Sequence, residues 1–396
     1  MERKLRANIW KFYLFNIFSS FVLYYAIDKI LMQSRGLSVT DMVIVEISYL
    51  VARLILEVPS GALADRWSRK YALALNMVFF MVNTFLWAIA PNLSVFILGD
   101  LIAAIHSALK YGTDTSFLYD TLKQLGKTDT YTKTQGNVIF WESLLSIIAG
   151  IIGGMIADAF GVVVPFWVTL PFSFAAMIVA LTFTEPQIHR TTGEMGFWKH
   201  IVETGKYLWK RPYLISLMVF SVIMGISLRP IDEYGQLYFI GVGVPVLALG
   251  YLSAVGSGIE AIAGKFAYLL SRFNRKKVFA VAIVTSSIGF IIVGLTNSWW
   301  GIPFAFLPFL AFYFTHLLVM TDLHNELPSE QRATGASFLS LMHSLAAIPL
   351  VFGFGRAADR FSIATAYLLV GILVAVYFVF FLFSFRTRKA GFDLPA

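Results

Sequence analysis

The chain contains no cysteine and few charged residues, and each shortage excludes a class of protein. Without cysteine there can be neither disulfides nor thiolate metal sites. Only 14% of the 396 residues are charged, whereas 58% are hydrophobic and the mean hydropathy is +0.73. A soluble globule with a polar surface is therefore excluded, and the composition indicates a polytopic, all-α membrane protein.

Features of nucleotide-binding and nucleic-acid-binding proteins are also missing. The stretch from Gly258 to Lys265 superficially resembles a phosphate-binding loop, but five residues separate its glycines instead of four. Phe266 stands where Ser or Thr would hold magnesium. The net charge of +8 does not predict nucleic-acid binding, because the cations stand in short loops between apolar runs. We expect no catalytic residues, no cofactor and no metal.

The sequence contains twelve apolar runs, each long enough to cross a membrane. Crossing about 30 Å of hydrocarbon takes about 20 helical residues. The first run exceeds a signal-peptide core in length and no small-residue cleavage site follows it, so we expect it to be retained. The runs cover residues 9–32, 40–63, 71–90, 94–119, 136–157, 160–183, 213–240, 246–270, 278–296, 300–322, 334–355 and 362–385.

Lysine and arginine are distributed unevenly over the connecting segments. If the N-terminus is cytosolic, 23 of the 31 cations lie in inside segments, and only Lys29, Arg35, Arg356 and Arg360 lie outside. This asymmetry follows the positive-inside rule and predicts cytoplasmic termini and an even number of crossings. We expect a monomeric, multi-pass protein of a bacterial-type inner (plasma) membrane.

The longest connection divides the chain into two halves of six predicted helices. We expect an N-terminal half at residues 1–185, a cytoplasmic linker with an amphipathic helix at 186–212 and a C-terminal half at 213–396. Pro212 would end the amphipathic helix.

The two halves repeat parts of each other's sequence. The segment Gly154-Met-Ile-Ala-Asp-Ala-Phe160 recurs 201 positions later as Gly355-Arg-Ala-Ala-Asp-Arg-Phe361. Likewise, Arg66-Trp-Ser-Arg69-Lys70 recurs as Arg272-Phe-Asn-Arg275-Lys276. A duplicated six-helix half is typical of transporters built from parallel repeats.

A short charged turn separates the second and third runs, with the sequence Gly61-Ala-Leu-Ala-Asp65-Arg66-Trp-Ser68-Arg69-Lys70. Gly61 would allow close backbone approach at a helix end, and Asp65 can face the positive N-terminus of another helix. The turn resembles the signature loop of the major facilitator superfamily. Ser68 departs from that loop's glycine, while the matching positions are Gly61, Leu63, Ala64, Asp65, Arg66, Arg69 and Lys70.

The resemblance implies a gate at the cytosolic end of the helices. Asp120, at the cytosolic end of the fourth run, lies in a stretch that resembles one common in bacterial members, and we expect it to help gate. The alternative is that the charged turn only fixes the topology.

Ionisable residues within the apolar runs are unevenly distributed. Burying a charge in lipid costs at least ~2.5–3.5 kcal/mol, so such groups must face protein or water. The third, sixth, ninth and twelfth runs have none and should be peripheral. The family resemblance implies the same arrangement, with the first, fourth, seventh and tenth helices lining a cavity. The candidate substrate and proton residues are Asp28, Glu46, Arg53, His106, Lys110, Asp114, Glu142, Arg229, Asp232, Glu233, Glu260, His316 and His343.

Helical spacing groups some of these residues. Arg53 shares a helix face with Glu46 and Glu57, and His106, Lys110 and Asp114 stand at i, i+4 and i+8. These rows could be structural ion-pair ladders or functional sites. Around Pro230 we expect a broken helix, whose charges make a binding site.

Proton coupling requires partly desolvated carboxylates or histidines near cations. Asp28, Asp232, Glu233 and Glu142 meet these conditions best. His316 and His343 could equally be satisfied core histidines. Glu142 has His343 as its counterpart in the repeat.

Taken together, these features predict a secondary transporter that moves a small organic solute by alternating access, using protons. Export of amphiphilic compounds is slightly favoured by the 37 Phe, 17 Tyr and 9 Trp, although lipid contact would also explain them. Uptake or exchange of a polar or anionic solute is the alternative, since Arg53, Lys110 and Arg229 could bind a carboxylate or phosphate. A non-transporting receptor or membrane enzyme would need a sensor domain or a catalytic constellation, and neither is visible.

Overall fold

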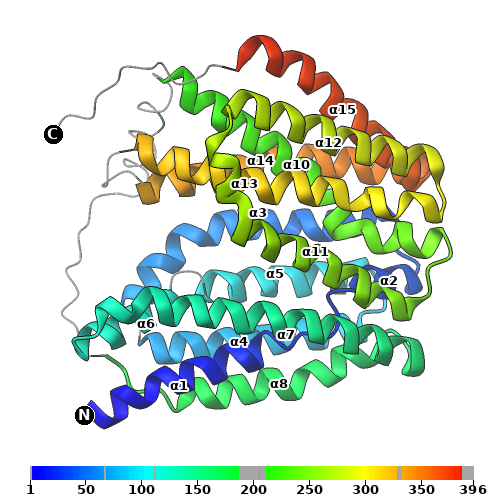
Figure 1. The fold of residues 1–396 in the computed structure, drawn as a ribbon. Helices are drawn as coiled ribbons and strands as arrows, with labels where there is room; N and C mark the ends of the chain where they lie inside the picture. Colours follow the sequence, from blue (N-terminus) through cyan, green and yellow to red (C-terminus); the bar gives the residue numbers. More distant parts are fainter. Residues whose placement is uncertain are drawn as a thin grey trace. The chain divides into compact units, whose positions relative to one another are not determined.

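A computed structural model of the chain describes residues 2–66, 68–110, 113–186, 205, 211–327 and 332–385. This part is helical and contains no strand. The helices group into two compact units (Figure 1). The first comprises Met1–Gly193 with Val244–Ser257, and the second comprises Glu194–Gly243 with Gly258–Ala396. The amphipathic helix expected within 186–212 lies outside the described residues.

The first unit begins with an interrupted helix. Residues 20–27 form turns between α1 and α2, so the first apolar run is not one continuous helix. Within this unit α4 packs against α5 and α8, and α3 packs against α5. Its elements are α1 (Glu2–Ser19), α2 (Asp28–Ser34), α3 (Val39–Arg66), α4 (Arg69–Ile89), α5 (Leu93–Lys110), α6 (Thr113–Gln124), η1 (Thr128–Thr130), α7 (Tyr131–Phe160) and α8 (Val164–Leu181).

The local sequence does not explain this break, because residues 20–27 contain neither proline nor glycine. Contacts with neighbouring helices hold it in place instead. The Leu23 N–H donates to the Thr169 hydroxyl at 3.1 Å, and the Tyr24 ring stacks on Phe166 with centroids 4.1 Å apart. A Cβ added to Gly153 would lie 1.7 Å from the Leu23 carbonyl oxygen. Irregular backbone at membrane depth persists only where protein or a cavity surrounds it, and here α7 and α8 supply the partners.

The second unit repeats the helix pairing of the first. α12 packs against α13 and α15, as α4 packs against α5 and α8. Its first helix, α10, is continuous. The elements are α10 (Pro212–Gly241), α11 (Val246–Phe266, assigned to the first unit up to Ser257), η2 (Ala267–Arg272), α12 (Arg275–Thr296), η3 (Trp299–Gly301), η4 (Pro303–Phe306), α13 (Leu307–Glu326), α14 (Arg332–Arg360) and α15 (Ile363–Ser384).

Each unit has a core of buried phenylalanines. In the first unit, Phe117 from α6 lies 4.5 Å from Phe183 and 6.2 Å from Phe12, measured between ring centroids. In the second unit, Phe220 of α10 stacks on Phe279 of α12 at 4.2 Å. All of these rings are at most 2% exposed. They pack the first, fourth and sixth runs together in the first unit, and the seventh and ninth runs together in the second unit.

Ten stretches of the described part are long and apolar enough to cross a membrane, judged by length and composition. The two expected runs outside this set are the first and the second. The first is divided between α1 and α2, and α3 carries several ionisable residues, including Asp41, Glu46 and Arg53. The remaining ten correspond to the expected third to twelfth runs.

Candidate functional site

Arg69 and Asp120 join α4 to α6, and we name this pair the first clamp. One terminal nitrogen of Arg69 contacts the Asp120 carboxylate and also donates to the Ser116 carbonyl oxygen, 2.7 Å away. The two charged side chains are only 10% and 16% exposed. Separating a shielded ion pair would leave both charges unpaired and partly buried, which is costly. The clamp therefore fixes the start of α4 against α6. The structure thus brings two of the expected gating residues together.

Glu185, which follows α8, holds the N-terminus of α4. Its carboxylate accepts hydrogen bonds from the Ser68 hydroxyl at 2.6 Å and from the backbone N–H groups of Arg69 and Lys70, each at 3.0 Å. The first N–H groups of a helix lack partners within it and form the positive end of its dipole, so an anion is favourable here. Sequence reasoning missed Glu185 because its partners stand 115–117 residues earlier.

The rest of the charged turn is described only in part. α3 continues through Gly61 and ends at Arg66, so the expectation that Gly61 stands at a helix end is wrong. The side chains of Asp65 and Arg66 lie outside the described part, and their gating role stays a prediction. The Lys70 ammonium lies 5.4 Å from the centroid of the Tyr71 ring.

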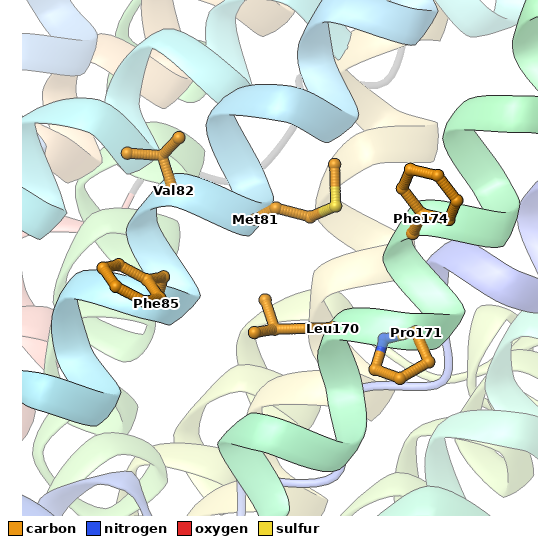
Figure 2. A pocket seen from close by; sticks show the side chains of 6 residues that line it. All are labelled: Met81, Val82, Phe85, Leu170, Pro171 and Phe174. Carbon is orange, nitrogen blue, oxygen red and sulfur yellow. The ribbon is translucent and has the colours of Figure 1, made fainter.

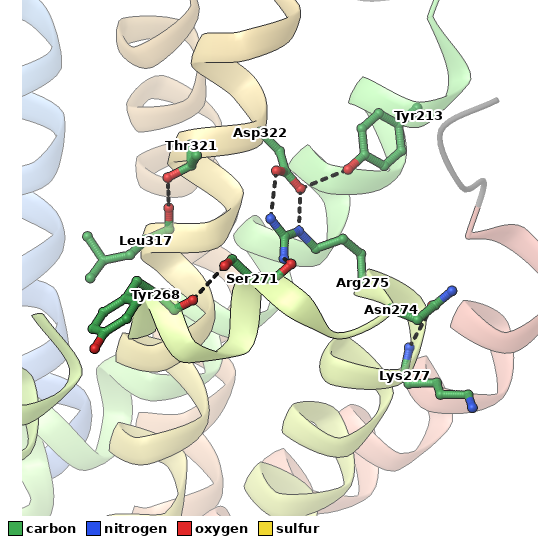
Figure 3. A network of polar contacts seen from close by, with 9 residues as sticks. All are labelled: Tyr213, Tyr268, Ser271, Asn274, Arg275, Lys277, Leu317, Thr321 and Asp322. Atoms are coloured by element: carbon green, nitrogen blue, oxygen red, sulfur yellow. Dashed lines mark hydrogen bonds and ion pairs between the residues drawn. The ribbon is translucent and has the colours of Figure 1, made fainter. Parts of the chain in front are cut away.

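A second clamp in the other unit joins α12 to α13 (Figure 3). Arg275 binds Asp322 with two nitrogens, Nε at 2.8 Å and Nη2 at 3.1 Å. The Tyr213 hydroxyl of α10 donates to the same carboxylate at 2.8 Å. Arg275 was recognised as the counterpart of Arg69, but Asp322 was missed. It could have been found in the sequence, because it stands 202 positions after Asp120.

Asp28 and Lys29 form a buried pair at the start of α2. The Lys29 ammonium lies 2.5 Å from the Asp28 carboxylate and 6.0 Å from the centroid of the Trp87 ring. Lys29 is only 5% exposed, which corrects its assignment to an outside loop. The Tyr24 hydroxyl hydrogen-bonds Thr84 at 3.1 Å and interacts electrostatically with Asp28 and with the buried Asp100 of α5. Sequence reasoning left Lys29 and Asp100 out of the candidate set.

Lys110 brings together two of the predicted carboxylates. Its ammonium lies 3.9 Å from Glu142 of α7 and interacts electrostatically with Asp114, in the first turn of α6. Asp114 also accepts a hydrogen bond from the Thr115 N–H at 2.7 Å. The Lys110 and Glu142 side chains are half-buried. This group can bind a polar solute or a proton, because two carboxylates face one cation.

His106 interacts electrostatically with Lys110 and also packs against α4. Its Nδ1 lies 3.0 Å from the Asn76 carbonyl oxygen, and its ring packs 4.9 Å from Phe80, both on α4. The Asn76 side chain in turn donates to the His106 carbonyl oxygen at 2.7 Å. These contacts make His106 part of the α4–α5 packing, and its place in the cavity stays a prediction.

Two predicted members of an ion-pair row lie on α3. Glu46 is buried, and Arg53 is half-buried seven residues later on the same helix face. The Glu57 side chain lies outside the described part, so the pairing of Arg53 with either glutamate stays a prediction.

The charges around Pro230 lie on a continuous helix. α10 runs unbroken from Pro212 to Gly241, so the expected break at Pro230 is wrong. The Tyr367 hydroxyl donates to the Pro230 carbonyl oxygen at 3.1 Å. Membrane helices tolerate proline where neighbouring helices satisfy the backbone groups in this way. Arg229 and Glu233 are half-buried and Asp232 is exposed.

Tyr313 connects the α10 charges with Glu260. It hydrogen-bonds Glu260 of α11 and interacts electrostatically with Asp232. Tyr313 lies on α13, three residues before His316.

His316 and His343 lie close enough to interact electrostatically. His343 Nε2 is 3.3 Å from the Ser221 hydroxyl of α10. His316 stacks on Phe312 with centroids 5.0 Å apart, and its Nδ1 is buried with no hydrogen-bond partner in the described part of the chain. The structure therefore joins α10, α13 and α14 through these two predicted residues.

An apolar groove of about 580 Å³ lies between α4 and α8 (Figure 2). These are the third and sixth runs, which the sequence predicts to be peripheral. Without a polar side chain, the groove cannot orient a polar solute. Its lining residues are Met81, Val82, Phe85, Leu170, Pro171 and Phe174.

Comparison with known proteins finds transporters. The uncharacterized MFS-type transporter YxaM of Bacillus subtilis (strain 168) is 20% identical over 341 residues, covering 82% of each chain. The quinolone resistance protein NorA of Staphylococcus aureus (strain MSSA476) is 21% identical over 380 residues, covering 91% of this chain and 92% of NorA.

Solved transporter structures share the fold at low sequence identity. The nucleoside transporter NupG matches with a TM-score of 0.79 and 16% identity, over 98% of this chain and all (100%) of that one. A bacterial homolog of the human lysosomal transporter Spinster, inward-facing and occupied, matches with a TM-score of 0.76 and 14% identity, over 96% of each chain. A sequence profile of the Major Facilitator Superfamily matches residues 9–350, and this multi-pass membrane protein therefore belongs to that family.

Proposed function

We propose that this protein is a secondary active transporter that moves a small organic solute across the plasma membrane by alternating access, coupled to protons. The observation that carries the proposal is the repeated clamp, Arg69 with Asp120 in one unit and Arg275 with Asp322 in the other. Each clamp preserves the packing of its own unit, and alternating access by rigid-body rocking needs two units that keep their internal packing. The proposal includes twelve crossings with both termini in the cytoplasm.

Export of amphiphilic compounds is the favoured direction. The similarity to a quinolone resistance protein supports export, and so does the aromatic content of 16%. Half-buried aromatic side chains offer flat apolar contacts that tolerate ligands of different shape.

Uptake or exchange of a polar or anionic solute is the second candidate. Lys110 is a half-buried cation in the group with Glu142 and Asp114, and Arg229 lies half-buried on α10. Either cation could pair with a carboxylate or phosphate group of the solute. The structural likeness to a nucleoside transporter and to a D-xylose–proton symporter is consistent with polar solutes.

Transport into proteoliposomes tests the proposal and separates the two candidates. We expect a fluorescent quinolone to accumulate against its gradient when a pH gradient is imposed, and a protonophore to abolish the accumulation. Accumulation of tritiated uridine in place of the quinolone would favour the uptake alternative. If neither accumulates, thermal-shift screening of a solute library supplies further probes, because a ligand of the folded state raises its melting temperature. A folded protein that neither binds nor moves any member would overturn the proposal.

The proposed orientation can be tested on intact cells. The chain lacks cysteine, so single cysteines at Ser94 and Lys127 can be probed with an impermeant maleimide. We expect label at position 94, before the fourth crossing, and none at position 127. The reverse pattern, or label at both positions, would contradict cytoplasmic termini.

A further inference from the structure

The histidine pair of the second unit stands where the first unit has a carboxylate pair. The offset of 202 positions that relates the clamp residues Asp120 and Asp322 also places His316 at the position of Asp114. An offset of 201 places His343 at the position of Glu142. The surrounding sequence supports this match, because Tyr111-Gly-Thr-Asp114 recurs as Tyr313-Phe-Thr-His316.

The matched residues also lie within electrostatic range of each other in their own units. Asp114 and Glu142 interact electrostatically in the first unit, and His316 and His343 do so in the second. Two independent observations, the repeat and the electrostatic interactions, thus define one pair of positions that carries titratable groups in both units.

The neighbours of the two pairs differ in charge. In the first unit Lys110 supplies a fixed cation 3.9 Å from Glu142. Phe312 occupies the position of Lys110 in the second unit, and its ring lies against His316 at an interplanar angle of 24°. A fixed cation would oppose an imidazolium, whereas an aromatic face attracts one. The second unit therefore has the neighbour that a protonated histidine needs.

The helices α10, α12 and α15 pack against α13 and α14, which carry the two imidazoles. α10 contributes the Ser221 hydroxyl at 3.3 Å from His343, and Gly225, where an added Cβ would lie 2.9 Å from the His343 ring. α12 after Lys277 and α15 contribute no ionisable side chains except the tyrosines of α15. Other ionisable residues of these helices and of α11 lie further along the chain from the imidazoles. Near the end of α13 where the helix begins they include Tyr313, with Arg229, Asp232 and Glu233 of α10 and Glu260 of α11. Near the end of α13 where the helix finishes they include Asp322, His324 and Glu326, with Arg275 of α12.

We propose that His316 and His343 form a proton-binding site that holds a single exchangeable proton. The buried and unpartnered Nδ1 of His316 offers a place for that proton, and the Ser221 hydroxyl satisfies His343 in either protonation state by rotating. A second proton would place two like charges within electrostatic range on half-buried side chains, which is costly. The role of this proton in driving transport rests on the function proposed above, but its binding does not.

Proton binding can be counted without knowing the substrate. The chain has six histidines, and ¹⁵N-histidine labelling of the protein in lipid nanodiscs reports how many become imidazolium between about pH 8 and about pH 5. We expect the pair to gain one imidazolium in the wild type and one in either His316→Gln or His343→Gln. The double variant should gain none. Two imidazolium equivalents in the wild-type pair, or none, would overturn the proposal.

Three further variants separate this site from ordinary packing. His324→Gln, on the exposed end of α13, serves as the control that removes a histidine without touching the pair. Phe312→Leu keeps an apolar side chain but removes the aromatic face, and we expect it to lower the imidazolium fraction at a given pH. Gly225→Ala should displace the His343 ring and alter its signal. An unchanged titration in both variants would contradict the proposed geometry.

Transport then tests the role of the proton separately. With a probe that the wild type accumulates, we expect His343→Gln to lose accumulation driven by a pH gradient while keeping exchange of the probe across the membrane. Retained gradient-driven accumulation would refute coupling through this pair. If the wild type moves no probe, the transporter function fails, while the imidazolium count still decides whether the pair binds one proton.

Discussion

The two units use the same Arg–Asp clamp but stabilise the helix that carries its arginine in different ways. In the first unit, Glu185 from the segment after α8 accepts three hydrogen bonds at the start of α4. In the second unit, the Asn274 side chain accepts one from the Lys277 N–H at 3.3 Å, so α12 is capped by its own preceding residue. The helix start that carries the first clamp is therefore stabilised by the segment after α8. The one that carries the second clamp is stabilised by its own preceding residue, and Tyr213 of α10 adds a hydrogen bond to Asp322.

The first helix of each half differs more strongly. In the first unit it is interrupted at residues 20–27, where Gly153 lies directly against the Leu23 backbone. In the second unit α10 is continuous, and the position that matches Gly153 holds Phe354, which stacks on Tyr234 with centroids 5.6 Å apart. A glycine makes room for irregular backbone, whereas a phenylalanine fills the space beside a regular helix.

Gly153→Ala should destabilise the protein more than any other single substitution proposed for either unit. The new Cβ would meet the Leu23 carbonyl oxygen at 1.7 Å, and the Leu23 backbone cannot shift cheaply because its N–H is bonded to Thr169. Overpacking usually costs ~1–3 kcal/mol and more where backbone must shift, so we expect little folded protein. The measurement is the yield of monodisperse protein in detergent and its melting temperature.

Gly353→Ala, on α14, is the matched control. Nothing lies within 4 Å of a Cβ built at Gly353, and alanine favours helix over glycine by about 1 kcal/mol. This variant should melt at or slightly above the wild-type temperature. Equal tolerance of alanine at 153 and 353 would show that the break in the first helix is not held by close backbone packing.

Arginine substitutions in the two clamps should have the next largest effect. Removing one partner of a shielded pair costs ~3–5 kcal/mol where burial is deep, and we expect Arg69→Ala to cost more than Arg275→Ala because Arg69 is less exposed. Lysine should restore more at position 69, where one nitrogen makes the contacts, than at position 275, where two nitrogens bind Asp322. Melting temperatures of all four variants in detergent test this order, and equal rescue by lysine at both positions would contradict it.

Long-range features of the sequence predicted more of this site than local ones. Apolar runs located ten helical stretches that are long and apolar enough to cross a membrane, because hydropathy depends on composition over about 20 residues. The internal repeat identified Arg275. Comparing the two halves further along the chain would also have identified Asp322, which stands 202 positions after Asp120. The spacing of Lys110 and Asp114 correctly placed them near each other, and the structure adds Glu142 from another helix.

Local signals failed where tertiary contacts dominate. Pro230 predicted a break, but α10 continues through it, while the actual break lies among residues with no proline or glycine. Lys29 lies near the end of the first run and was assigned to an outside segment by its charge, although it is buried and contacts Asp28 and Trp87. His106 has the spacing of Lys110 and Asp114, but the spacing did not predict its two hydrogen bonds with Asn76 of α4. Such outcomes depend on which helices become neighbours, and that information is spread over the whole chain.

Glu185→Gln should have a moderate effect that is confined to the first unit. Glutamine keeps one acceptor oxygen but removes the negative charge from the positive end of α4, and it can satisfy fewer of the three donors. We expect a loss of ~1–2 kcal/mol, with Glu185→Ala at or beyond the upper end. Hydrogen–deuterium exchange should rise in the first turn of α4 and stay unchanged in the first turn of α12. Faster exchange in both helices would mean that Glu185 acts on global stability and not as a cap.

Asn274→Ala should have the smallest effect and should leave the first unit untouched. The alanine removes one cap bond, which is worth ~1 kcal/mol, while Arg275 keeps its two bonds to Asp322. Asn274→Asp is the matched control, since aspartate caps as well as asparagine and also suits the helix dipole. Because the three hydrogen bonds described for Glu185 lie at the start of α4 and the one for Asn274 lies at the start of α12, the double variant Glu185→Gln with Asn274→Ala should lose the sum of the two single losses, within about 0.5 kcal/mol. A larger deviation in the melting data would show that the two helix starts are energetically coupled. In that case the two units would not be independent, although one helix is capped by a distant segment and the other by its own preceding residue.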